Sequence, residues 1–390
     1  MRVIEILFWT GAFIVFYTYL GYGIILGIMV RIKEYFRPYV KPQLPSDLPH
    51  VTLFIAAYNE ELIVREKMEN VYNLIYPKDK LHVLWVTDGS DDRTNEILKG
   101  YTDVMICYTP ERRGKSMAIN HGMEYVQTPY VVYTDANAML NKEALLEIIR
   151  LFGNPKVGCV AGEKRVHQGE KQSAGATEGI YWKYESKLKE WDYHFYSAVG
   201  AAGELFALRT NLFMILSEDT LLDDFILSLR IAMKGYRIGY CREAYAMETA
   251  SVDMNEEAKR KKRISAGGLQ SIFRLLPLLN IFKYGRLSWQ YISHRVLRWT
   301  ITPFTLFALF PLNIILLWSE HVLLYSIILF LQVIFYLMAF VGTLLARRQL
   351  RNKILFVPYY FIFMNLNVFA GIKYLFLNKQ KGVWEKAKRA

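Results

Sequence analysis

The chain has 390 residues, of which 53% are hydrophobic, 15% aromatic and 22% charged. Disordered chains, collagen-like repeats and pure membrane bundles have other compositions, so we expect a soluble domain joined to membrane spans. The net charge of +12 would suit nucleic acid, anionic substrates or a membrane surface, and we favour the membrane because basic residues cluster beside apolar runs. Cys107, Cys159 and Cys241 lie far apart and predict neither a disulfide framework nor a zinc site.

A membrane anchor is predicted for residues 1–37. Residues 6–30 contain no charged side chain, and a helix of that length crosses the ~30 Å hydrocarbon core. A cleaved signal peptide has a shorter apolar core that ends in small residues, so we interpret this run as a retained anchor. The basic residues Arg31, Lys33 and Arg37 predict that its C-terminal end is cytoplasmic. Residues 38–50 contain four prolines and are interpreted as a stiff linker.

After the linker, short apolar strands alternate with helical stretches. Strands are predicted at 51–57, 81–87, 104–108 and 130–134, and helices at 60–74, 94–99 and 116–126. This alternation predicts an α/β domain with a mainly parallel sheet and helices on both faces. Ligands of such sheets bind at the carboxyl ends of the strands, where functional side chains are therefore expected.

Polar residues of both charges stand at those strand ends. Acidic turns after strands commonly serve as helix caps, but their convergence with Arg and Lys on one sheet edge suits a phosphate-bearing ligand and a metal ion. The chain has no P-loop and no G-x-G-x-x-G turn, which argues against those two nucleotide-binding modes. The segments concerned are Ala57–Glu60, Asp88–Asp92, Arg112–Lys115 and Asp135–Asn137.

With their flanking residues, these segments resemble family-2 inverting glycosyltransferases, which have the GT-A fold and use nucleotide-diphosphate sugars. The membrane-bound branch of that family includes poly-N-acetylglucosamine, hyaluronan, chitin and cellulose synthases. The resemblance covers residues 51–270 as the catalytic domain. The motifs that carry it are Phe54–Glu61, Thr87–Thr94, Arg113–Lys115 with Asn120, and Thr134–Asn137.

The resemblance implies roles in donor binding. Asp88 would read the uracil edge, Lys115 would lie near the base and phosphates, and Asp135 would bind the ribose or a metal ion. Asn137 stands where the family usually has a second metal-binding aspartate; its carbonyl oxygen can still bind Mg²⁺ or Mn²⁺, but with less charge. A turn or cap role is the alternative for Asn137. Ala57, Tyr58 and Glu60 complete the substrate-binding residues expected on this side.

The resemblance also implies an acceptor side. Asp224, the second acid of Asp223–Asp224, would be the general base, and Asp223 would support the loop or contact the acceptor. Gly203 belongs to a small-residue segment that resembles the acceptor wall. Arg263 would bind the diphosphate. Processive synthases have a Q-x-x-R-W motif at this position. In this chain Arg260 replaces the glutamine and Ile264 replaces the tryptophan.

The C-terminal part predicts more membrane helices. A helix over Ile272–Phe282 opens an interfacial region at 271–298. Uncharged runs at 299–319, 322–346 and 354–372 lie within a membrane region at 299–378, followed by a basic tail at 379–390. The third run either spans, which would place the basic tail outside against the positive-inside trend, or is a re-entrant or interfacial segment.

These features predict a multi-pass enzyme of the inner or plasma membrane, with a cytoplasmic catalytic domain and a divalent-metal cofactor. We expect it to extend a cell-surface or extracellular polysaccharide from a UDP-sugar. Transfer of a single sugar to a lipid acceptor is the nearer alternative, and an inactive channel or scaffold the more distant one. Expected partners are the donor, a carbohydrate or lipid acceptor and membrane lipids, together with a second copy or an export protein, but no nucleic acid.

Overall fold

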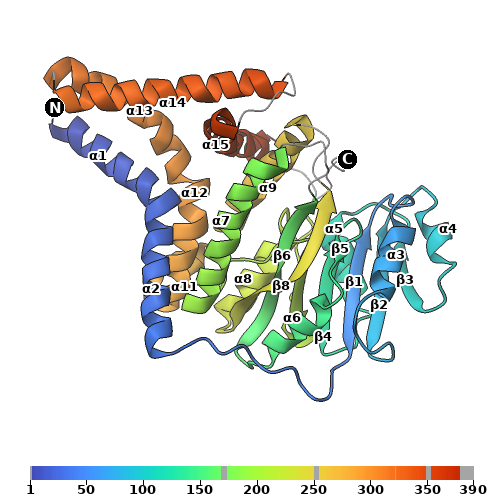
Figure 1. The fold of residues 1–390 in the computed structure, drawn as a ribbon. Coiled ribbons are helices and arrows are strands. Elements are labelled where there is room, and N and C mark those ends of the chain that lie inside the picture. Colours follow the sequence, from blue (N-terminus) through green and yellow to red (C-terminus); the bar gives the residue numbers. More distant parts are fainter. Residues whose placement is uncertain (1, 168–173, 250–253, 321, 348–352, 378–390) are drawn as a thin grey trace.

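A computed structural model describes residues 2–167, 174–249, 254–320, 322–347 and 353–377 of the chain. The predicted basic tail at 379–390 lies outside the described residues. Figure 1 shows a mixed sheet with its helices on one side of the molecule and a group of long helices from both chain ends on the other.

The sheet has eight strands in the order β3-β2-β1-β4-β7-β6-β8-β5. Strands β1 to β4 pair in parallel, as the alternating pattern predicted. Strand β7 breaks that arrangement because it pairs antiparallel with both β4 and β6, and β5 pairs antiparallel with β8. The strands are β1 Val51–Ala57, β2 Leu81–Asp88, β3 Val104–Thr109, β4 Tyr130–Asp135, β5 Met139–Leu140, β6 Val157–His167, β7 Leu205–Arg209 and β8 Arg237–Thr249.

Helices of the soluble domain pack on this sheet, with α5 against β1 and β2, and α6 and α8 against β6 and β8. The helix predicted from residue 60 begins later, because the Glu60 carbonyl accepts hydrogen bonds from Ile63 and Val64 in a turn. The helices are α3 Val64–Tyr72, α4 Thr94–Leu98, α5 Lys115–Met123, α6 Ala144–Phe152, α7 Ala174–Phe195, the 3₁₀ turn η2 Thr210–Leu212, and α8 Asp223–Met233.

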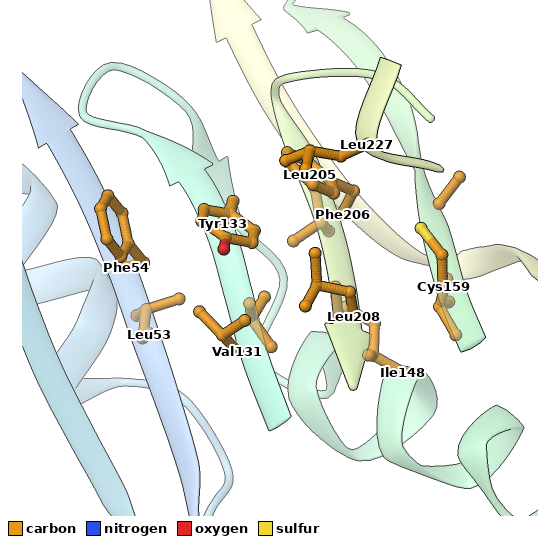
Figure 2. Close-up of a cluster of buried hydrophobic side chains, with 14 of the residues drawn as sticks. Leu53, Phe54, Val131, Tyr133, Ile148, Cys159, Leu205, Phe206, Leu208 and Leu227 are labelled. Carbon is orange, nitrogen blue, oxygen red and sulfur yellow. The ribbon is translucent and has the colours of Figure 1, made fainter. Parts of the chain in front are cut away.

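The core of this domain lies along the central strands (Figure 2). Leu53 on β1 and Val131 on β4 are fully buried. The Tyr133 ring stacks on Phe206 of β7, with centroids 4.6 Å apart. Full burial of each such side chain contributes about 1.5–3 kcal/mol to the stability of the fold. Strand β7 is antiparallel to β4, yet its side chains belong to the same core as those of β1 and β4.

In the described residues four helical segments are long and apolar enough to cross a membrane: 2–36, 301–319, 323–346 and 354–377. The third C-terminal run thus has the length of a span. Helix α1 packs on α13, and α15 packs on α9 and α14. The elements are α1 Arg2–Phe16, the π-helical turn η1 Tyr17–Gly21, α2 Tyr22–Phe36, α13 Ile301–Glu320, α14 Leu323–Arg347 and α15 Lys353–Leu377.

The segment that links the sheet domain to these helices is broken into short pieces. The continuous helix predicted over 272–282 is wrong, because α9 ends at Arg274 and a new 3₁₀ turn begins at Leu276, with Pro277 in its first turn. The pieces are α9 Met254–Arg274, η3 Leu276–Leu279, α10 Ile281–Tyr284, α11 Arg286–Tyr291, the π-helical turn η4 Ile292–Val296 and α12 Leu297–Trp299.

Candidate active site

A cavity of about 810 Å³ extends from the carboxyl end of β4 to the long apolar helices. Its sheet half is formed by Lys115, Asp135, Gly203, Glu204, Asp223 and Asp224. Its membrane half is formed by η1, the end of α1 and the facing side of α15: Val15, Phe16, Tyr19, Leu20, Val357, Phe361, Met364, Asn365 and Val368. Charged side chains and apolar side chains therefore line the same cavity.

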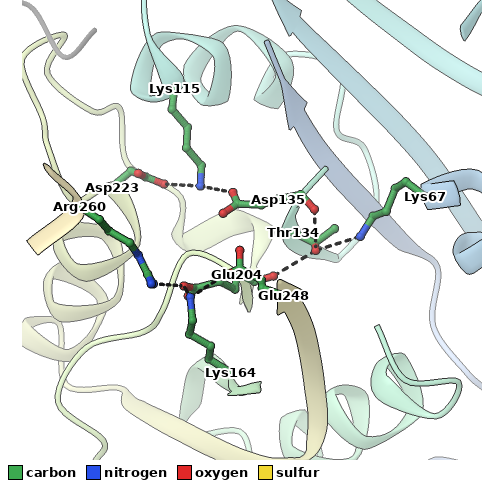
Figure 3. Close-up of polar contacts among 9 residues, drawn as sticks. All are labelled: Lys67, Lys115, Thr134, Asp135, Lys164, Glu204, Asp223, Glu248 and Arg260. Carbon is green, nitrogen blue, oxygen red and sulfur yellow. Dashed lines mark hydrogen bonds and ion pairs between the residues drawn. The ribbon is translucent and has the colours of Figure 1, made fainter. Parts of the chain in front are cut away.

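Lys115 is the central cation of the sheet half (Figure 3). Its Nζ lies 2.6 Å from Asp135 Oδ1 and 4.0 Å from Asp223 Oδ2. Lys115 is the first residue of α5 and follows Gly114, whose φ of +93° L side chains rarely adopt. Asp135 and Asp223 hold the pKa of Lys115 above its usual value despite burial, so the side chain stays cationic.

Asp224 lies beside this pair in the first turn of α8. Burial and the neighbouring Asp223 raise the pKa of Asp224 to about 7, against the opposing charge of Lys115. Gly203 lies next to both charged groups: a Cβ atom there would be 3.7 Å from Asp224 Oδ2 and 3.3 Å from Lys115 Nζ. A carboxylate with this pKa is suited to accept a proton at neutral pH.

A second ionic network borders the same half (Figure 3). Lys164 on β6 forms ion pairs with Glu204 and Glu248, and Arg260 on α9 lies 3.1 Å from Glu204. Although burial alone would raise the pKa of Glu204, Lys164 and Arg260 hold it well below its usual range. Arg260 and Arg263, which is one turn later on α9, both line the cavity.

The residues expected to bind the nucleotide lie at the neighbouring strand ends. Both carboxylate oxygens of Asp88 accept backbone N–H groups, from Arg113 at 2.8 Å and Gly114 at 2.7 Å. The guanidinium carbon of Arg112 lies over the Tyr58 ring, 3.7 Å from the ring centroid. Asp88 therefore fixes the loop before α5. The sequence motifs that contain Asp88 and Arg113 did not predict this contact. Ala57, Tyr58, Glu60 and Asp88 are absent from the described residues that line the cavity itself.

Asp135 and Asn137 offer oxygen ligands of the kind that Mg²⁺ and Mn²⁺ prefer. Lys115 donates to Asp135 Oδ1, and no described residue donates to Oδ2. Asn137 is half-buried in the turn after β4. Below this turn, fully buried Lys67 donates to the Thr134 hydroxyl and the Ala138 carbonyl (Figure 3). The residues fit a divalent ion that takes its remaining ligands from a diphosphate.

Contacts between distant elements shape the membrane half, and the sequence motifs did not disclose them. Tyr19 of η1 donates a 2.6 Å hydrogen bond to Asn365 of α15 across the cavity. Tyr184 of α7 in turn donates to the Tyr19 carbonyl at 2.7 Å. A faint signal exists in the sequence, since Asn365 is a polar residue within an apolar run, but it does not identify a partner 346 positions away.

Comparison with known proteins identifies the domain. Residues 52–214 match the family Glycosyl transferase family 2. Beta-monoglucosyldiacylglycerol synthase of Trichormus variabilis is 30% identical over 236 residues, which cover 56% of this chain and 49% of that protein. Poly-beta-1,6-N-acetyl-D-glucosamine synthase of Staphylococcus aureus is 26% identical over 243 residues, 60% of this chain and 58% of that protein. The chain thus spans about half the length of these relatives.

A solved structure matches nearly the whole chain. Mannosyltransferase PcManGT from Pyrobaculum calidifontis, in complex with GDP-Man and Mn²⁺, covers 97% of this chain and 100% of its own, with a TM-score of 0.71 and 20% identity. At that identity the match shows a shared fold. Residues 52–214 are therefore a family 2 glycosyltransferase domain of the GT-A type, set against helices apolar enough to span a membrane, and the family and fold predicted from the motifs are confirmed.

Proposed function

We propose that this protein transfers a sugar, with inversion, from a UDP-sugar to the hydroxyl group of a lipid-anchored acceptor at the cytoplasmic face of a membrane. The observation that carries the proposal is the single cavity that joins Asp224 and Lys115 to the apolar membrane half. Such a space lets an acceptor keep its tail among membrane helices while its hydroxyl group reaches the carboxylate.

Asp224 acts as the general base. Its carboxylate takes the proton of the acceptor hydroxyl while that oxygen bonds to the anomeric carbon, and the bond from this carbon to the diphosphate oxygen breaks. Attack from the face opposite the leaving group inverts the anomeric configuration. The pKa of about 7 leaves a substantial fraction of Asp224 ionised at neutral pH, which the base role requires.

Arg263 and Lys115 stabilise the departing diphosphate. Both line the cavity, and both keep a positive charge at neutral pH, which favours the charge that develops on the leaving group. A Mg²⁺ or Mn²⁺ ion held by Asp135 and Asn137 would neutralise further diphosphate charge when bound. Asp223, which lies within 4.0 Å of Lys115, orients that lysine.

A lipid-anchored acceptor fits the membrane half better than a growing polysaccharide does. A sugar chain needs hydrogen-bond partners along its path, since its hydroxyl groups are costly to bury unpaired. Tyr19 and Asn365 bond to each other, and their neighbours there are mainly aliphatic or aromatic. The names of the two relatives describe one enzyme of each kind, so polysaccharide extension is the competing outcome of the test.

The test uses the full chain in nanodiscs with membrane lipid extract, Mn²⁺ or Mg²⁺, and a panel of radiolabelled UDP- and GDP-sugars. We expect label from one UDP-sugar to enter the organic phase, with one UDP released per sugar transferred. Label confined to high-mass aqueous polymer would favour polysaccharide extension. If no donor releases its nucleotide in the presence of lipid, the proposal is wrong.

A further inference from the structure

A buried cation without a protein acceptor lies at the cavity wall. Lys189 of α7 is only 7% exposed and lines the cavity, yet within the described chain no oxygen atom accepts a hydrogen bond from its ammonium group. The Tyr240 ring, with its centroid 6.0 Å from Nζ, provides a weak cation–π contact. Burying an ammonium group is costly unless an anion pairs with it, so the position calls for an acceptor from outside the chain.

The carboxylates near Lys189 already have other partners. Glu185, one turn earlier on α7, lies 2.7 Å from Arg295 and 2.9 Å from Arg298. One carboxylate thus faces two guanidinium groups, and Lys189 adds a third positive charge. Of the other nearby acids, Glu204 pairs with Lys164 and Arg260. Glu163 accepts a hydrogen bond from the Ser186 hydroxyl, and within the described chain it accepts none from Lys189.

The result is a group of three cations, Lys189, Arg295 and Arg298, around the Glu185 carboxylate at the cavity wall. Burial lowers the pKa of Lys189 and Arg295 lowers it further, whereas the carboxylates of Glu185, Glu163 and Glu204 oppose that change. A bound anion would relieve the repulsion between Lys189 and Arg295. Because both residues line the same cavity as Asp224, that anion belongs to a molecule that occupies the cavity.

The position of this charge indicates what carries the anion. Tyr184, next to Glu185 on α7, bonds to Tyr19 of η1, which lies in the membrane half. The cationic group therefore adjoins apolar helices, while Asp224 stands in the sheet half. An acceptor that passes from one half to the other would place its headgroup beside Lys189.

We propose that Lys189 and Arg295 form a phosphate subsite for an acceptor lipid that carries a phosphate or diphosphate between its apolar tail and its acceptor hydroxyl. The inference rests on the proposed function and narrows its acceptor from lipids in general to phosphate-bearing lipids. Lys189 is a binding residue in this proposal. Neutral glycerolipids would lack the group that it pairs with.

Binding can be measured apart from catalysis by native mass spectrometry of the full chain in neutral detergent. The probes are a polyprenyl phosphate, the matching polyprenol and inorganic phosphate, with UDP binding followed separately. The variants are Lys189→Gln and Lys189→Arg, and Lys187→Gln is the matched control. Lys187 is exposed on the same helix and pairs with Glu190, away from the cavity.

We expect the polyprenyl phosphate to bind about tenfold to a hundredfold more tightly than the polyprenol, as a charge-assisted hydrogen bond would give. Lys189→Gln should remove most of that preference, whereas Lys189→Arg and Lys187→Gln should keep it. UDP binding should be the same in all four proteins. Equal binding of phosphate and alcohol, an unchanged preference in Lys189→Gln, or equal binding of inorganic phosphate would overturn the subsite.

The two proposals fail in different ways. If label from the UDP-sugar enters a neutral lipid while the polyprenyl phosphate shows no preference, the subsite is wrong and the proposed function stands. If the polyprenyl phosphate binds through Lys189 but no lipid is ever labelled, the subsite stands and the acceptor assignment is wrong.

Discussion

Adjacent carboxylates at the start of α8 have different surroundings, and that difference supports the roles proposed for them. Asp223 is buried and lies within reach of Lys115, so its charge is partly balanced. Asp224 is partly exposed to the cavity, and its pKa is raised to about 7. In the proposed mechanism, Asp224 therefore serves in proton transfer and Asp223 holds Lys115.

Replacement of the base should remove turnover and its pH dependence. Asp224→Asn should lower kcat by about 10²–10⁴-fold while UDP binding stays near that of the wild type. In the wild-type protein, kcat/KM should rise as pH increases through about 7, because Asp224 must lose its proton before it can accept one. An unperturbed aspartate would give a flat profile over that range. Wild-type turnover in purified Asp224→Asn would refute the assignment.

Arg263 should act more on turnover than on donor affinity. If its guanidinium group meets charge that grows on the leaving diphosphate, Arg263→Ala lowers kcat more than it weakens UDP binding. Arg263→Lys should recover only part of the rate, since an ammonium group lacks the two-pronged geometry of guanidinium. Steady-state kinetics and UDP titration of both variants provide the measurement. Equal losses in kcat and in affinity would mean that Arg263 merely holds the substrate.

Removal of divalent ions should stop transfer. Only Asp135 contributes a formal charge to the proposed metal ligands, because Asn137 is neutral, so we expect weak affinity and a need for excess Mg²⁺ or Mn²⁺. Activity after treatment with EDTA should return on addition of either ion. Asn137→Asp should lower the metal concentration needed for half-maximal rate. Full activity in thoroughly chelated protein would exclude the metal role.

At the scale of elements, the loop before β7 positions α8 through a glycine. Gly200 has φ of +87°, and a Cβ atom there would lie 2.2 Å from the Phe225 ring, next to the proposed base. Gly200→Ala should therefore lower the free energy of unfolding by more than the ~1–3 kcal/mol of backbone strain, and should also reduce transfer. Thermal unfolding and turnover of the variant test this.

Gly235 offers the matched control. Its φ is +94°, but an added Cβ atom would meet no heavy atom within 4 Å. Gly235→Ala thus carries the backbone strain without the steric clash and should leave turnover nearly unchanged. If both variants lose stability and activity equally, Gly200 does not position α8 through Phe225.

Local patterns allowed part of the fold to be predicted. The strands from Val51 to Asp135 follow from apolar runs bounded by turn residues, and the polar side chains at their ends follow from the parallel pairing. The antiparallel insertion of β7 could not be predicted, because strand order depends on packing between segments far apart in the sequence. The ion pairs of Lys164 and the lack of an acceptor for Lys189 in the described chain could not be predicted for the same reason. Neither feature leaves a local pattern in the sequence.

At the scale of the whole molecule, the sheet domain and the apolar helices line one cavity together. Figure 1 shows the helices of both chain ends beside the sheet. Helix α9 follows the last strand of the sheet and packs on α15, so the helix that carries Arg263 also borders the membrane half. The hydrogen bond between Tyr19 and Asn365 joins η1 to α15 beside the same space. The proposed acceptor site is therefore lined by both parts of the chain together.

This arrangement predicts that each acceptor receives one sugar. A processive enzyme must move its product along a path with polar partners, whereas the membrane half offers apolar side chains, and the Tyr19–Asn365 pair holds η1 and α15 together there. With the full chain in nanodiscs, limiting acceptor lipid and excess UDP-sugar, mass spectrometry should show a single added sugar at all reaction times. The added mass should not depend on the ratio of enzyme to acceptor. A ladder of lengths that grows with time would contradict this prediction and would instead indicate a polymer that leaves between η1 and α15.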